Sequence, residues 1–107
     1  MTSSDIKRAI NKASSSICKY KISAIAFDRS GNFLGICNNK PFLSKYGGSV
    51  HAEMQLLNRY GSNNISKIIL FRTNKNGSSL LPIEPCSSCK KTLDKYGIKV
   101  FSINEVL

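Results

Sequence analysis

The apolar run Ile68-Ile69-Leu70-Phe71 limits the fold of this chain more than any other stretch. A strand without alternating polar positions has no face that suits water, so such strands lie in sheets that are covered on both sides. The run and its flanks predict a strand over Ile65–Thr73, at a buried position beside a parallel neighbour. The chain must then supply helices for both faces of the sheet.

Hydrophobic spacing predicts three helices to cover such a sheet. Apolar residues recur at three- and four-residue steps over Ile6–Ile17, which indicates a first helix with one apolar face and capping oxygens at residues 3–5. A second helix is expected over Val50–Tyr60 and a third from just after Pro85 to Tyr96, each followed by a stopping glycine.

The segments between the helices complete the predicted order. A hairpin is expected between the first and second helices, and a single strand is expected after each of the two later helices. The strands lie at 22–27, 33–37, 65–73 and 98–103, and the turns or loops at 28–32, 38–49 and 74–79. This order predicts one α/β domain over residues 1–107, with three layers (α-β-α) around a mixed sheet.

The charge of +10 at pH 7 leaves two interpretations open. A basic surface attracts phosphates, so a nucleotide or nucleic-acid partner is one of them. The other is composition alone, because the basic residues are twelve lysines and only four arginines in a chain also rich in asparagine and isoleucine. All three abundant residues have AT-rich codons. Arginine, the better phosphate reader, is scarce.

Neither a membrane span nor a secretory leader is expected. No stretch reaches the roughly 18–20 apolar residues that a spanning helix needs, and the first residues lack a basic flank followed by an apolar run. We therefore expect a cytoplasmic protein without a membrane partner. Because a core this small leaves apolar surface exposed, we also expect a homo-oligomer. Cys18 and Cys37 lie among apolar residues and are interpreted as buried thiols.

The chemically informative residues are His51-Ala52-Glu53 and, 31 residues further on, Pro85-Cys86-Ser87-Ser88-Cys89. Zinc favours imidazole and thiolate ligands in a tetrahedral arrangement. Two cysteines separated by two residues at the start of a helix can face one ion, and the helix N-terminus favours their thiolate form. His51, Cys86 and Cys89 are therefore candidate zinc ligands.

Three protein ligands leave the fourth position of the ion open, which is typical of a catalytic zinc site. Water there can ionise near neutral pH. Glu53, two residues from His51, is close enough to reach that water without binding the metal, so it is the candidate catalytic acid and base.

The combination is the H-x-E … P-C-x-x-C signature of the zinc deaminases. On these residues the chain resembles the cytidine/deoxycytidylate deaminase superfamily, which also includes tRNA adenosine and guanine deaminases. The resemblance implies a cytidine-deaminase-like fold, His51, Cys86 and Cys89 as Zn²⁺ ligands, and Glu53 as proton shuttle. The chain departs from many relatives by ending soon after its fourth predicted strand, so it is short at the C-terminus.

Substrate contacts are predicted from the same resemblance and from position. Asn39 resembles the asparagine that contacts the substrate sugar in several relatives, although an asparagine in a loop also commonly forms a turn. Tyr46 lies in the loop before the predicted catalytic helix, and Ala52 lies between His51 and Glu53. We expect Tyr60 and Tyr96, which precede the two stopping glycines, to pack at the helix ends.

We expect a zinc-dependent hydrolase that converts a cytosine-containing nucleoside or nucleotide to the uracil product and ammonia. The alternative within this class is a deaminase of cytosine or adenine in single-stranded DNA or RNA. Outside it, His51, Cys86, Cys89 and Cys37 could close a structural zinc site in a non-catalytic domain. A redox dithiol is a further alternative, but it leaves His51 beside Glu53 unexplained. A nucleic-acid-binding module without catalysis is another, but no aromatic-rich strand or reader motif supports it.

Overall fold

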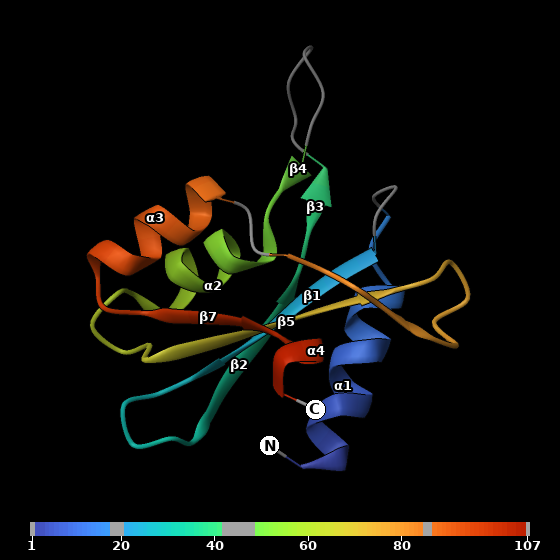
Figure 1. Ribbon diagram of the computed structural model, residues 1–107, viewed down its shortest axis with the longest axis horizontal. Coiled ribbons are helices and arrows are strands. Elements are labelled where there is room, and N and C mark those ends of the chain that lie inside the picture. Colours follow the sequence, from blue (N-terminus) through green and yellow to red (C-terminus); the bar gives the residue numbers. More distant parts are fainter. Residues whose placement is uncertain (1, 18–20, 42–48, 85–86, 107) are drawn as a thin grey trace.

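The computed structural model describes residues 2–17, 21–41, 49–84 and 87–106, and its centre is a five-stranded mixed sheet (Figure 1). The strand order is β2-β1-β5-β6, with β7 also beside β5. The strands are β1 (Lys21–Phe27), β2 (Phe33–Asn38), β5 (Lys67–Thr73), β6 (Leu80–Leu81) and β7 (Lys99–Ser102). Two short strands, β3 (Lys40–Pro41) and β4 (Ser49–Val50), pair separately.

Strand β5 holds the sheet together. Its seven residues pair antiparallel with β1 along one edge. Its other edge is shared, because Lys67–Leu70 pair in parallel with β7 and Arg72–Thr73 pair antiparallel with β6. The predicted parallel neighbour and the mixed sheet are both confirmed.

Helices cover both faces of this sheet (Figure 1). α1 (Ser3–Ser14) packs on β1 and β5, and the short α4 (Ile103–Val106) packs on β5 and β7. On the opposite face, α2 (Ala52–Tyr60) packs on β1 and β2, and α3 (Ser87–Lys95) packs on β7. The fold is therefore the predicted three-layer α-β-α arrangement. None of the described helices is long and apolar enough to cross a membrane.

The apolar run in β5 supplies both cores. Ile68 and Leu70 join the core under α2 and α3, whereas Ile69 and Phe71 join the core under α1 and α4. All four side chains are at most 1% exposed. Side chains of a strand alternate between its faces, so a strand covered on both sides needs apolar residues at every position.

The first helix is shifted from its predicted bounds. Thr2 and Asp5 form a capping box at its start, with Thr2 Oγ1 accepting from the Asp5 N–H and the Asp5 carboxylate accepting from the Thr2 N–H. The helix ends at Ser14, and Ile17, predicted on its apolar face, is 80% exposed. Hydroxyls of serines 14 and 15 bond to carbonyls of the last turn and so compete with its continuation.

The bounds of the other helices and strands lie closer to the predicted ones. β5 begins at Lys67 rather than Ile65, and α2 at Ala52 rather than Val50. Ile103, predicted at the end of a strand, begins α4 and is fully buried. The two-residue strands β3, β4 and β6 were not predicted, because two residues are too few to form a periodic pattern.

A residue of β2 and the last residue of α2 are in close contact. A Cβ atom at Gly35 would overlap the phenol group of Tyr60, the last residue of α2. Tyr60 therefore packs at its helix end, as predicted. Its ring lies over Gly35, where the absence of a Cβ atom leaves room for it.

We expect Gly35→Ala to lower the free energy of unfolding by about 1–3 kcal/mol, the usual range for overpacking. Urea unfolding measures the loss. In the double variant Gly35→Ala/Tyr60→Leu the ring is gone, so the alanine should cost less there than in the wild-type background. Equal costs in both backgrounds would contradict the contact.

Candidate metal centre and active site

His51 lies at the N-terminus of α2. It is the N-cap residue, with an extended backbone (φ −68°, ψ 147°), and its carbonyl accepts the hydrogen bond of the Gln55 N–H. Its imidazole makes no capping hydrogen bond. Ala52 and Leu56, both fully buried, hold the helix against the sheet. The backbone of His51 thus starts the helix, while its half-buried ring remains available for other contacts.

Cys89 meets this ring from the first turn of α3. Its Sγ lies 3.2 Å from His51 Nδ1, and Cys89 is only 7% exposed. The two residues are 38 positions apart in sequence, so the packing of α2 and α3 on one face of the sheet brings them together. The structure thus brings the predicted imidazole and one of the predicted thiols together.

Glu53 completes the cluster. One ligand atom each from His51, Glu53 and Cys89 lies within 4.8 Å of the other two. The Glu53 side chain is 3% exposed. Burial raises the pKa of Glu53 above its usual range, although a backbone hydrogen bond, the charge of His51 and a hydrogen bond with Cys89 partly oppose this shift. A carboxylate of this kind accepts a proton more readily than one in water.

The donor set fits zinc. Zn–N bonds of about 2.0–2.1 Å and Zn–S bonds of about 2.3 Å, at a tetrahedral angle, would place nitrogen and sulfur about 3.6 Å apart. The His51 Nδ1 to Cys89 Sγ distance of 3.2 Å is within a few tenths of an ångström of that value. A small side-chain adjustment would suffice to bind the ion.

Asn39 has a structural role that the sequence did not indicate. It is 4% exposed, and its Oδ1 accepts hydrogen bonds from Ser16 Oγ (2.7 Å) and the Ile22 N–H (3.2 Å). Asn39 thereby ties the segment after α1 to the start of β1. A substrate contact by Asn39 stays a prediction.

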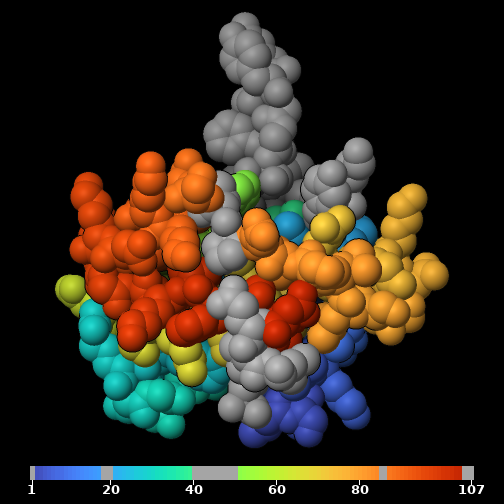
Figure 2. Space-filling model, in the orientation of Figure 1, coloured from blue at the N-terminus to red at the C-terminus, as the bar shows by residue number. Residues whose placement is uncertain are grey.

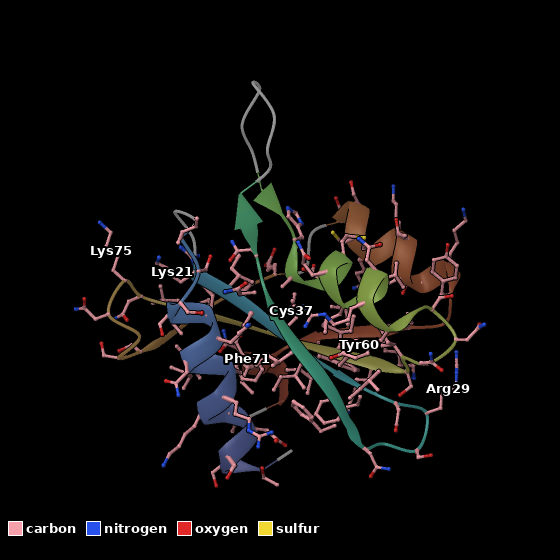
Figure 3. All side chains as sticks on the ribbon, turned by 180° about the vertical axis from the view of Figure 1, so that it is seen from behind. Lys21, Arg29, Cys37, Tyr60, Phe71 and Lys75 are labelled. Atoms are coloured by element: carbon pink, nitrogen blue, oxygen red, sulfur yellow. The ribbon has the colours of Figure 1, made fainter. Side chains whose placement is uncertain are left out.

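The other predicted site residues differ in position. Ala52 is buried in the core beneath α2, next to the cluster along the chain. Cys37, the fourth ligand of the structural-zinc alternative, is not among the clustered residues; it lies in β2 and packs in the core that also holds Tyr60 (Figure 3). Cys86 and Tyr46, as well as Cys18, fall outside the described residues.

The sequence matches no protein-family model and no curated protein. Solved structures do match the fold. Cytidine deaminase from Mycobacterium leprae is 19% identical with a TM-score of 0.60, and the match covers 94% of this chain and 87% of that one. Cytidine deaminase from Mycobacterium tuberculosis is 16% identical with a TM-score of 0.60, covering 94% and 85%. These likenesses confirm the cytidine-deaminase-like fold expected from the H-x-E … P-C-x-x-C signature.

Zinc content distinguishes the open site from the closed structural one. We expect about one zinc per chain in the wild type, retention in Cys37→Ser and loss in Cys89→Ser, because of the two described cysteines Cys89 lies beside His51 and Cys37 does not. Elemental analysis of freshly purified protein measures this. Cys37→Ala serves as a second variant in case the buried hydroxyl disturbs the core. Loss of zinc from a folded Cys37 variant would favour the closed site.

The raised pKa of Glu53 predicts a pH dependence for the metal-free protein. The folded state holds the Glu53 proton more tightly than the unfolded state. This contribution to stability is fully present below the unfolded pKa and is lost as pH rises through the folded pKa. Urea unfolding of chelator-treated protein should show this loss in the wild type and not in Glu53→Gln. Parallel curves for the two proteins would contradict it.

Proposed function

We propose that the chain is a zinc-dependent hydrolytic deaminase that converts a cytosine-containing nucleoside or nucleotide to the uracil product with release of ammonia. The observation that carries the proposal is the meeting of His51, Cys89 and buried Glu53 within 4.8 Å of one another. The cytidine-deaminase-like fold also supports the proposal. Because a fold alone does not specify an activity, the clustered residues carry more of the argument.

His51, Cys86 and Cys89 would hold the metal. Bound zinc supplies Lewis acidity, which makes water a nucleophile near neutral pH. A histidine and a thiolate from two separate helices place that chemistry at one end of α2 and α3. The helix N-termini add partial positive charge, which favours the thiolate form of Cys89 in the first turn of α3.

Glu53 would move the protons. Its carboxylate takes a proton from the attacking water and delivers it to the ring nitrogen next to the amine-bearing carbon. The carbon–oxygen bond forms, the second proton of the same water passes to the amine, and the carbon–nitrogen bond breaks so that the amine leaves as ammonia. Burial suits Glu53 to this role because a carboxylate that is only 3% exposed accepts a proton more readily than one in water.

The partners follow from this proposal. A small cytosine-containing nucleoside or nucleotide is the substrate, and the substrate panel below identifies its sugar and phosphate state. Homo-oligomerisation, a cytoplasmic location and a single domain over residues 1–107 stay predictions from the sequence.

Replacing Glu53 tests the mechanism. Glu53→Gln should keep its zinc, because Glu53 is not assigned as a ligand, and should lose about 10²–10⁴-fold or more in ammonia release. Cytidine, deoxycytidine, their monophosphates, adenosine and guanine form the substrate panel. Asp94→Asn, an exposed carboxylate on α3, is the matched control and should keep full activity. Undiminished turnover by Glu53→Gln would remove Glu53 from the mechanism.

A further inference from the structure

An open, polar cavity of about 340 Å³ lies at the end of α2 that is opposite His51. The turn between β1 and β2 forms one of its walls, and the loop between α2 and β5 forms the other. In Figure 2 the turn (cyan) and the loop (yellow-green) reach the surface at the left edge of the molecule. At 1.5 Å per residue, the nine-residue helix separates this end from His51 by about 13 Å. The cavity is therefore distinct from the candidate metal centre.

Hydrogen bonds hold the turn in one shape. Asp28 Oδ1 accepts from the N–H groups of Ser30 and Asn32, at 3.0 and 2.9 Å. The Asp28 carbonyl accepts from Ser66 Oγ at 2.7 Å, and Ser66 lies just before β5. The turn that carries Asp28 is thus fixed both within itself and to the sheet.

Arg29 joins the turn to the loop. Its Nε donates to the Asn63 carbonyl at 2.8 Å. On the same loop, Asn64 Nδ2 donates to the Tyr60 carbonyl at 2.7 Å, which ties the loop to the end of α2. Figure 3 shows Arg29 and Tyr60 on the same side of the molecule. Both walls are therefore formed before any ligand binds, as is usual for small-molecule sites.

Tyr60 and Leu34 supply the apolar part of the lining. The half-buried position of Tyr60 depends on its fit over Gly35 and is not general for helix ends in this chain. Tyr96, directly after α3, is 48% exposed, so the prediction that it packs at its helix end is wrong.

The Arg29 guanidinium has the geometry of an anion-binding group. Its Nε is engaged, so the plane of the group is set, whereas its two terminal nitrogens contact no other described residue. Two guanidinium nitrogens in a fixed plane form the fork that matches a carboxylate or a phosphate. An exposed lysine offers neither the plane nor the fork, and no lysine is among the residues that line the cavity.

Asp28 adds a second requirement. Its Oδ1 is used by the turn, and its Oδ2 accepts no hydrogen bond within the described part of the chain. An anion without a hydrogen-bond donor would meet this carboxylate and be repelled by it. A ligand that also carries a hydroxyl or an amine would donate to Asp28 instead.

We propose that this cavity binds a small organic anion. Its phosphate or carboxylate group lies on the Arg29 guanidinium, and a hydroxyl or amine of the same molecule donates to Asp28. The volume of about 340 Å³ is near the lower end of the range for small-molecule sites, roughly 300–1,000 Å³. The proposal does not depend on the deaminase function, because His51, Glu53 and Cys89 take no part in it.

Titration of the full-length purified protein with glycerol 3-phosphate or glycerate, followed by ¹H–¹⁵N NMR, tests the proposal. The amides of residues 28–32 and 61–66 and the Arg29 Nε–H group report on the cavity. Their signals should shift saturably with at least one of the two anions, and the tighter one identifies the anionic group. Absence of saturable shifts with both, or shifts confined to other parts of the chain, would overturn the proposal.

Two further ligands separate the requirements. Glycerol carries the donors without the anion, and methyl phosphate carries the anion without the hydroxyl groups. Each should bind at least about tenfold more weakly than glycerol 3-phosphate, because each loses a hydrogen bond to a charged group. Asp28→Asn keeps the oxygen that caps the turn and should bring the affinities for glycerol 3-phosphate and methyl phosphate closer together. An unchanged ratio would remove Asp28 from the site.

Replacing Arg29 tests the anion contact. Arg29→Gln should weaken binding of glycerol 3-phosphate at least about tenfold, and Arg29→Lys should restore only part of it, since lysine keeps the charge but not the fork. Arg59→Gln is the matched control, because Arg59 is an exposed arginine in the last turn of α2 that does not line the cavity. It should bind like the wild type. Equal weakening by Arg29→Gln and Arg59→Gln would mean that net charge alone drives binding and would overturn the site.

Discussion

The contact between His51 and Cys89 is the constraint on which the functional interpretation depends. His51 Nδ1 and Cys89 Sγ are 3.2 Å apart, although the two residues lie at the starts of different helices. Each helix is fixed separately, α2 by Ala52 and Leu56 and α3 by Leu93, and all three residues share one core on a single face of the sheet. The apolar centre of β5 contributes to that core. The packing that covers one face of the sheet therefore also brings the two candidate ligands together.

Burial of Glu53 is costly for an ion and useful for a catalyst. A carboxylate at 3% exposure loses most of its hydration, and the raised pKa of Glu53 is the result. Such a cost is tolerated where an adjacent cation or a proton compensates it. Glu53 beside two metal-type ligands is consistent with that arrangement, whereas a merely structural residue at this position would be cheaper as glutamine or an apolar side chain.

The sequence predicted the features that come from periodic patterns or from paired motifs. The three layers, the parallel β5–β7 pair and the meeting of His51 with Cys89 followed from hydrophobic spacing and residue type. It could not predict that Asn39 is tied to Ser16 and Ile22, because those contacts depend on where α1 stops. The exposure of Tyr96 and the fit of Tyr60 over Gly35 also depend on three-dimensional packing, which local patterns do not encode.

The proposed deaminase requires an ion held by one imidazole and two thiolates, with one position open beside Glu53. X-ray absorption at the zinc edge of the purified protein measures that coordination directly. We expect two sulfur ligands at about 2.3 Å, together with a nitrogen and one further light atom at about 2.0–2.1 Å. A third sulfur ligand, or no zinc signal in freshly purified protein, would contradict it.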